Sequence, residues 1–152
     1  MADRSGRTAL VSGAGNGLGR AISLALAAAG HRVILVGRNA APLEQTAEQI
    51  GKRARVGLVD VADAGSVAAL AADLKDETIS VLVNNAGVPG PVKPLVEIEP
   101  DEWDDVFAVN VRGIFLMCRA FLPRMIEGGY GDVINLASVS GKRPLALRTP
   151  YA

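Results

Sequence analysis

The chain has 152 residues, and its 16 lysines and arginines balance 16 aspartates and glutamates, so its formal net charge is zero. Hydrophobic residues make up 49% of the sequence, which excludes a disordered chain and predicts one domain with a substantial core. The balanced charge argues against nucleic acid or an anionic membrane as a partner, and the single cysteine excludes an internal disulfide framework.

Two further classes of protein are not expected from the residue pattern. No cysteine and histidine cluster has the spacing of a zinc site, so we expect no metal. No uninterrupted apolar run has the length of a membrane span, and no apolar segment of signal-peptide length precedes the first turn. We therefore expect a cytoplasmic protein.

Short runs rich in β-branched residues alternate with helical patterns along the chain. The predicted strands cover residues 8–12, 32–36, 54–59, 79–83 and 132–137. They are almost continuously apolar, as is typical of strands buried on both faces of a parallel sheet. The predicted helices cover residues 18–29, 40–50, 64–75 and 101–126. This alternation predicts an α/β fold with a doubly wound parallel sheet and right-handed crossovers.

The first predicted strand leads directly into a glycine-rich turn with the spacing G-x-x-x-G-x-G. Its glycines are Gly13, Gly15, Gly17 and Gly19. Glycine permits positive φ and lets backbone N–H groups approach a phosphate, which the N-terminus of the next helix also attracts. No Gly-Lys-Ser/Thr follows, which excludes a Walker loop. We expect the turn, including Asn16 and Leu18, to bind phosphate; the alternative is a tight structural turn.

A polar or glycine-rich segment follows each of the five predicted strands. In chain order these segments begin with Gly13, Gly37, Asp60, Asn84 and Ser138. Ligands of open α/β sheets bind beyond the carboxyl ends of the strands, where all five segments should meet. The sequence therefore predicts a site at this edge of the sheet.

Several ordered motifs make the sequence resemble the short-chain dehydrogenase/reductase family. Besides the glycine spacing, these are LVNNAG (82–87), VNVRGIF (109–115), VINLASVSG (133–141) and PYA (150–152). The resemblance implies a Rossmann fold and hydride transfer between a nicotinamide coenzyme and a carbonyl or alcohol substrate. It covers the whole chain, which corresponds to about the first three-fifths of a typical member of roughly 250 residues. The chain is thus expected to be a coenzyme-binding domain truncated at its C-terminal end.

Arg38 bears on the choice between NADP and NAD. A carboxylate about 20 residues after the glycine turn would accept hydrogen bonds from a ribose hydroxyl and suit NAD. The sequence has VGRN there, and an arginine suits the 2′-phosphate of NADP. We therefore expect NADP to be preferred, with NAD possible. Asn16 stands where many NADP-preferring relatives carry a basic residue, and an arginine that merely ends a strand is the alternative.

The resemblance assigns further coenzyme contacts after the third and fourth strands. Asp60 would accept from the adenine amino group, and the backbone of Val61 would meet the ring. The alternative for Asp60 is to cap the next helix, a role that Asp63 could fill equally well. The segment containing Asn85, Ala86 and Gly87 would line the nicotinamide side; its alternative is an Asn/Gly turn.

The resemblance also implies a catalytic set. Tyr151 would be the acid/base, Ser138 would hydrogen-bond the substrate oxygen, and Asn110 would hold a water in the proton relay. The alternative for Asn110 is a mid-helix asparagine that faces solvent or bonds to the backbone. Ser138 precedes Tyr151 by 13 residues and is preferred to Ser140, which lies further past the strand end. A tyrosine with a pKa near 10 needs nearby positive charge to act as a base. The family carries a lysine four residues after this tyrosine, whereas the sequence ends at Ala152, so we expect little turnover from these 152 residues alone.

Two other functions remain open at this stage. A non-catalytic NAD(P)-binding or sensory module would need only the glycine turn and Arg38. A methyltransferase on a similar sheet would place an acidic residue at the second strand end, and Arg38 argues against it. For the enzyme, the expected partners are a small carbonyl or alcohol substrate and further copies of the chain, as a dimer or tetramer.

Overall fold

A computed structural model describes residues 6–152, which build one parallel sheet of five strands in the order β3-β2-β1-β4-β5. The strands are β1 (Thr8–Ser12), β2 (Arg32–Gly37), β3 (Ala54–Leu58), β4 (Ile79–Asn84) and β5 (Asp132–Asn135). The chain runs outward from β1 to β3 and then returns to place β4 on the other side of β1. This reversal lies between β1 and β4, and such switch points are where α/β sheets bind ligands.

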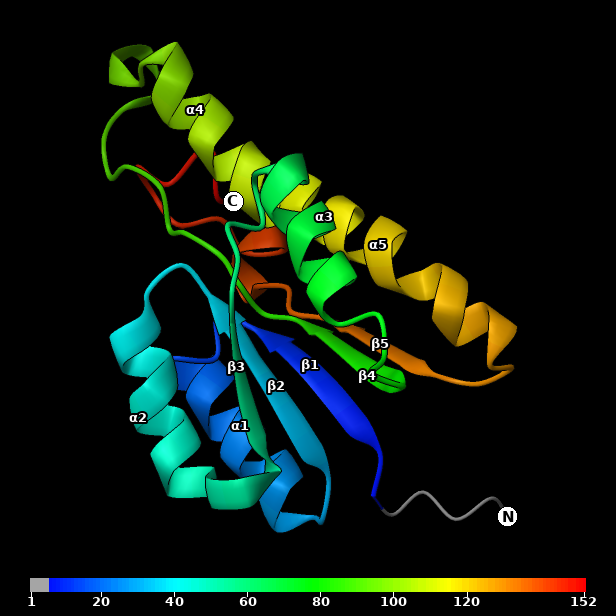
Figure 1. The fold of residues 1–152 in the computed structure, drawn as a ribbon. Helices are drawn as coiled ribbons and strands as arrows, with labels where there is room; N and C mark the ends of the chain where they lie inside the picture. Colours follow the sequence, from blue (N-terminus) through cyan, green and yellow to red (C-terminus); the bar gives the residue numbers. More distant parts are fainter. Residues whose placement is uncertain (1–5) are drawn as a thin grey trace.

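Helices cover both faces of the sheet, as the alternating sequence pattern predicts. They are α1 (Gly17–Ala28), α2 (Ala40–Ile50), α3 (Ala64–Asp73), α4 (Pro100–Phe107) and α5 (Gly113–Glu127). Helices α1 and α2 lie on one face, α3 and α5 lie on the other, and α4 extends beyond the sheet (Figure 1). Short 3-10 turns occupy Gly51–Arg53, Leu95–Glu97 and Val139–Gly141. The prediction of a doubly wound α/β fold is confirmed.

Alternation along the strands divides the core into two layers. Leu10 of β1 packs with Leu82 and Phe121 on the side of α3 and α5. Its neighbours Ala9 and Val11 pack with Leu43 and the other small apolar residues on the side of α1 and α2. All residues of β1 and β4 are buried, so these two strands hold the carboxyl edge of the sheet in a fixed position.

The prediction that every strand is buried on both faces is wrong for β5. All four of its residues are exposed, because β5 forms one edge of the sheet and, among the described elements, makes extensive contact with β4 alone. The opposite edge strand, β3, is mostly half-buried. The strand also ends at Asn135, two residues earlier than predicted, although the N–H of Leu136 still donates to the carbonyl of Asn84 at 2.9 Å.

The single helix predicted over 101–126 is divided into α4 and α5 by a π-helical segment, Ala108–Arg112. No glycine or proline marks this change within the segment. Its centre is Asn110, whose side chain bonds to a loop from another part of the chain. A tertiary contact of this kind leaves no periodic signal, and π segments of this kind are frequent at functional sites. Helix α5 continues through Pro123 to Glu127.

The combined stretch Pro100–Glu127 is long and apolar enough to cross a membrane by length and composition. That criterion is weak evidence, since core helices also meet it. Here Leu116, Met117, Phe121 and Met125 of α5 are buried in the sheet core. Within residues 6–152 no other helix meets the criterion.

Candidate active site

The glycine-rich turn lies between β1 and α1 in a space too narrow for side chains. Gly13 has φ +66°, and a Cβ there would lie 2.9 Å from Nδ2 of Asn85 and 3.1 Å from Cα of Ala86. A Cβ on Gly19 would overlap the carbonyl oxygen of Gly13. The two glycines therefore allow the turn, the first helical turn of α1 and the end of β4 to lie in direct contact.

Ser12 fastens the glycine turn to the segment after β4. Its buried Oγ accepts hydrogen bonds from the N–H groups of Asn85 and Ala86, both at 3.0 Å. In return, the side-chain amide of Asn85 donates to the carbonyls of Ser12 (3.0 Å) and Gly13 (3.3 Å). Asn85 thus links two strand ends, which gives it a structural role as well as the predicted place beside the coenzyme.

A first cleft opens beside this turn, towards β2 and β3. Seven predicted coenzyme residues line it, namely Gly13, Gly15, Asn16, Arg38, Val61, Ala86 and Gly87. Arg38 is exposed at the mouth, and its guanidinium has no hydrogen-bond or ion-pair partner among residues 6–152. Among residues 6–152, no Asp or Glu lines this cleft. The cleft therefore offers an unneutralised cation beside a turn of small residues, an arrangement suited to an anion.

The residues after β3 separate the two roles that the sequence left open for Asp60. Asp63 is the N-cap of α3 and accepts from the N–H of Ser66 at 2.8 Å. Asp60 instead accepts from the N–H of Ala62 at 3.0 Å and lies with Arg38 in a side pocket that adjoins α4. Val61 is buried, and its side chain packs where a Cβ on Gly113 would lie.

A second cleft contains the predicted catalytic residues. Asn110, Ser138 and Tyr151 all line it, together with Leu18 and Asn85. The two clefts share Ala86, Gly87 and Val88. The segment after β4 therefore forms a wall common to both, and an extended ligand could pass along it from one cleft to the other.

Asn110 holds this common wall in place. Its Oδ1 accepts from the N–H of Val88 at 2.8 Å, and its Nδ2 donates to the carbonyl of Val88 at 2.9 Å. The side chain is therefore bonded to backbone, as the alternative for this residue proposed. The predicted role of Asn110 in holding a water stays a prediction.

Of the two serines considered for the substrate oxygen, Ser138 lines the second cleft and Ser140 does not. Ser138 is half-buried and lines the second cleft, where its Oγ accepts from the N–H of Ser140 at 3.2 Å. Ser140 is buried and does not line that cleft. Tyr151 is half-buried, and its N–H donates to the carbonyl of Arg148 at 3.0 Å. No lysine among residues 6–152 lines this cleft.

Three residues of the site carried no recognised signal in the sequence. Arg20 and Thr46 hold the glycine turn from outside the cleft, and Asn135 accepts a 2.8 Å hydrogen bond from Nδ2 of Asn84 at the floor of the second cleft. Asn135 could have been found as a polar residue inside a predicted strand. Arg20 and Thr46 could not, because a polar residue on a helix is usually solvated.

The part of the chain that the structure describes contains no set of metal ligands. No group of three His, Cys, Asp or Glu side chains within residues 6–152 is arranged so that it could hold a metal ion. Cys118 is half-buried in α5, where its Sγ accepts from Nδ2 of Asn84 at 3.4 Å. The polar groups that the described residues bring to the two clefts are amides, hydroxyls, the exposed guanidinium of Arg38 and the phenol of Tyr151.

Comparisons with known proteins agree with this geometry. The sequence model of a family described as short chain dehydrogenase matches residues 7–152. D-threitol dehydrogenase of Mycolicibacterium smegmatis is 44% identical over 96% of this chain and 58% of its own length. Galactitol 2-dehydrogenase (L-tagatose-forming) of Cereibacter sphaeroides is 41% identical over 90% of this chain and 54% of its own length. A metagenomic short-chain oxidoreductase in complex with NADP superimposes with a TM-score of 0.91 at 38% identity, covering 97% of this chain and 69% of its own. The chain thus spans a little over half the length of the curated relatives that it matches.

Proposed function

Because the chain belongs to the short-chain dehydrogenase family, we propose that it is the coenzyme-binding domain of an NADP-dependent oxidoreductase that interconverts a secondary alcohol and a ketone. One observation carries the proposal. The glycine-rich turn lines the first cleft, and the second is lined by Ser138, Asn110 and Tyr151. The two clefts meet at Ala86, Gly87 and Val88. A dinucleotide that follows this wall would have its adenosine end in the first cleft and its nicotinamide in the second.

The preference for NADP rests on Arg38. Its free guanidinium at the mouth of the first cleft can form charge-assisted hydrogen bonds to a 2′-phosphate. The described residues place no carboxylate in the lining of this cleft that would favour a bare ribose, although NAD can still enter it. A coenzyme contact for Asp60 at the adenine is consistent with its place in the adjoining side pocket.

The catalytic roles follow from the chemistry that each residue can perform. The bound coenzyme would supply or take up the hydride. Ser138 would donate a hydrogen bond to the substrate oxygen, and Tyr151 would exchange a proton with that oxygen. Since the pKa of a free tyrosine lies near 10, Tyr151 needs positive charge nearby to act as a base at neutral pH. Asn110 would fix the backbone of Val88 and hold a water of the proton relay.

The substrate class is proposed from the relatives and from the second cleft. The relatives include dehydrogenases of threitol and galactitol, which are small polyols. The second cleft is lined by asparagines, Ser138, Tyr151 and apolar side chains, without any charged residue from the described part of the chain. An uncharged secondary alcohol or ketone matches this lining.

The enzyme is proposed to be cytoplasmic and homo-oligomeric. Four large apolar residues recur every four positions along α4, the π-helical segment and α5, and each is at least 38% exposed: Trp103, Phe107, Val111 and Phe115. The rings of Trp103 and Phe107 stack at 4.9 Å between centroids. A second copy of the chain would cover such a face, as the resemblance to the family implies.

The test separates an oxidoreductase from a non-catalytic binding module. Tyr151→Phe, in the gene product at its natural length, should lose turnover of NADP with a polyol or ketone while its dissociation constant for NADP changes less than twofold. Arg38→Met should weaken NADP at least tenfold and NAD much less. Unchanged turnover in Tyr151→Phe would refute the catalytic role, and failure of the unmodified protein to bind either coenzyme would refute the proposed function as a whole.

A further inference from the structure

The outer side of the glycine turn carries a hydrogen-bonded cluster that the proposed function does not use. Arg20, in the second turn of α1, donates from Nη2 to the carbonyl of Gly15 at 2.6 Å and from Nε to Oγ1 of Thr46 at 3.1 Å. Thr46 belongs to α2 and is completely buried. The two side chains therefore connect the turn to two helices at once.

Thr46 fixes the carbonyl of Ala14, which precedes that of Gly15 in the turn, in the same way. Its Oγ1 lies 3.2 Å from the carbonyl oxygen of Ala14 and 3.0 Å from that of Pro42. The hydroxyl has one proton, while Arg20 occupies one of its lone pairs. The carbonyl of Pro42 lies in the first turn of α2, where the helix ladder already supplies a donor, whereas that of Ala14 has no other donor among residues 6–152. The hydroxyl proton of Thr46 is therefore needed most by the carbonyl of Ala14.

Fixing two carbonyls also fixes two N–H groups. In a planar trans peptide the C=O of one residue and the N–H of the next point in opposite directions. With the carbonyls of Ala14 and Gly15 turned outward to Thr46 and Arg20, the N–H groups of Gly15 and Asn16 are turned the other way. Both residues line the first cleft, and neither N–H forms a hydrogen bond of close, well-aligned geometry with another residue of the described part of the chain.

These two donors lie at the α2 end of the first cleft. A Cβ on Gly15 would lie 2.8 Å from Cβ of Pro42, so the turn is in contact with the first turn of α2. Arg38, Asn39 and Pro42 line the same end, whereas Ala86 and Gly87 line the other. The free guanidinium of Arg38 and the two free N–H groups thus face one small volume.

We propose that Arg20 and Thr46 are positioning residues for the 2′-phosphate of NADP: by holding the carbonyls of Ala14 and Gly15 outward, they present the N–H groups of Gly15 and Asn16 to that phosphate beside Arg38. The inference rests on the proposed function, because it concerns the coenzyme of the same site. It assigns part of the selectivity for NADP over NAD to side chains that never touch the coenzyme.

The test uses a neutral, nearly isosteric pair, so that a change in charge cannot account for the result. Thr46→Val removes the hydroxyl, and Thr46→Ser keeps it. Calorimetric titration of each variant with NADP, NAD and 2′,5′-ADP is compared with the unmodified chain. Thr46→Val should raise the dissociation constants of NADP and 2′,5′-ADP roughly five- to tenfold, as expected when a hydrogen bond to a charged group is weakened. The constant for NAD should change less than twofold, and Thr46→Ser should restore all three values to within twofold.

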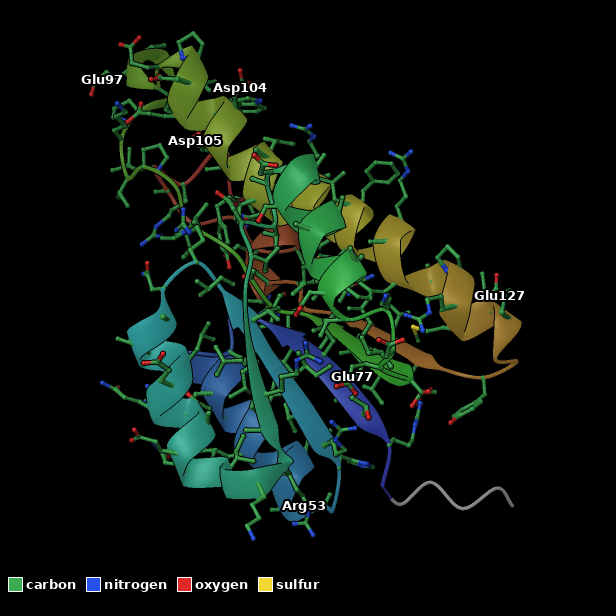
Figure 2. The ribbon with its side chains drawn as sticks, in the orientation of Figure 1. Arg53, Glu77, Glu97, Asp104, Asp105 and Glu127 are labelled. Atoms are coloured by element: carbon green, nitrogen blue, oxygen red, sulfur yellow. The ribbon has the colours of Figure 1, made fainter. Side chains whose placement is uncertain are left out.

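Arg20 provides the second arm and a matched control. Arg20→Met should weaken NADP more than Thr46→Val does, and Arg20→Lys should recover part of the loss through a single donor. Arg53→Met removes an exposed arginine from the turn at the far end of α2 (Figure 2) and should leave all three constants unchanged. Melting temperatures show whether each variant is folded at the titration temperature.

The outcomes distinguish this proposal from the one on which it rests. Equal weakening of NADP and NAD, or no change in Thr46→Val, would overturn the positioning role while leaving the proposed function intact. If the unmodified chain binds neither coenzyme, the proposed function itself fails. A loss of NADP affinity in Thr46→Val with NAD retained, and its recovery in Thr46→Ser, would establish the inference.

Discussion

The coenzyme cleft and the segment that carries Ser138 and Tyr151 are held in the fold in opposite ways. Around the glycine turn, Ser12, Asn85 and Arg20 join three elements through hydrogen bonds between part-buried or buried groups. The segment from residue 136 to residue 152 is joined to the rest of the chain by few bonds. One is the 3.0 Å bond from the N–H of Lys93 to the carbonyl of Leu147.

This difference indicates where the site is preorganised. A phosphate turn that is already rigid loses little conformational entropy when its ligand binds, which favours affinity. The substrate side leaves large apolar side chains exposed, among them Val139 at 69% and Leu145 at 61%, so its shape depends on further contacts. Substitutions in the first region should therefore cost much more than matched substitutions in the second.

Gly19→Ala should produce the largest effect of all. Its Cβ would overlap the carbonyl of Gly13 and lie 2.5 Å from Nδ2 of Asn85, so α1 must move away from β4. We expect coenzyme affinity to fall at least about 100-fold and stability to fall by about 3 kcal/mol. Isothermal titration and urea unfolding measure the two quantities.

Gly17→Ala is the control for that substitution. Gly17 has φ +49°, but nothing lies within 4 Å of its Cβ position. Only the left-handed backbone is penalised, at about 1–2 kcal/mol. Equal losses in Gly17→Ala and Gly19→Ala would show that the close approach of α1 and β4 is not what shapes the cleft.

The same substitution in both regions, Ser12→Ala and Ser138→Ala, tests the comparison directly. Ser12→Ala leaves the N–H groups of Asn85 and Ala86 without their acceptor, at a cost of about 2–3 kcal/mol. Half-buried Ser138 accepts a single hydrogen bond among residues 6–152, from the N–H of Ser140 at 3.2 Å, and its loss should cost less than about 1 kcal/mol. Urea unfolding of both variants gives the answer, and Ser12→Thr, which keeps the hydroxyl, should recover most of the loss. Similar losses at the two serines would contradict the comparison.

The sequence predicted the order of the elements because each buried strand and each helix face leaves a periodic apolar pattern. It also predicted which strand ends meet, since a parallel sheet brings all its carboxyl ends to one edge. It could not predict the π segment at Asn110 or the bonds of Thr46, because both depend on which distant backbone group lies opposite a polar side chain. For Asp60 and Asp63 the local pattern was ambiguous, and only the observed N-cap assigns Asp63 to that role.

Glu77→Gln tests whether a loss of overall stability is enough to weaken coenzyme binding. Glu77 precedes β4, so it lies at the amino ends of the strands, away from the coenzyme cleft at their carboxyl ends (Figure 2). Burial raises the pKa of Glu77, but the hydrogen bond from Arg55 at 2.9 Å and the charge of Arg32 more than offset this, so its pKa lies below the ordinary value. A carboxyl with a lowered pKa stabilises the fold above its unfolded pKa, and this contribution is lost as the pH falls through its folded pKa. The variant should lose about 1–2 kcal/mol of unfolding free energy at neutral pH. On acidification it should lose less further stability than the unmodified chain, because it has no carboxylate to protonate at this position.

The decisive measurement for Glu77→Gln is its affinity for the coenzyme. The residue lines neither cleft, so the dissociation constant for NADP should stay within twofold of the unmodified value. A large drop in affinity at an intact fold would mean that the rigidity of the cleft is a property of the whole sheet. The contrast between the two regions would then lose its local basis.

Leu147→Gly should have the smallest effect and should change stability in the opposite direction. Leu147 has φ +63°, a left-handed conformation that penalises a side chain by about 1–2 kcal/mol. Glycine removes the penalty but adds about 0.4–1 kcal/mol of entropy to the unfolded chain, so the net gain should be about 0–1 kcal/mol. Leu147→Ala keeps the strained backbone and serves as the control, which should gain nothing. A clear loss of stability in both Leu147→Gly and Leu147→Ala would contradict this expectation, because it would show that the side chain holds this segment more firmly than its 47% exposure indicates.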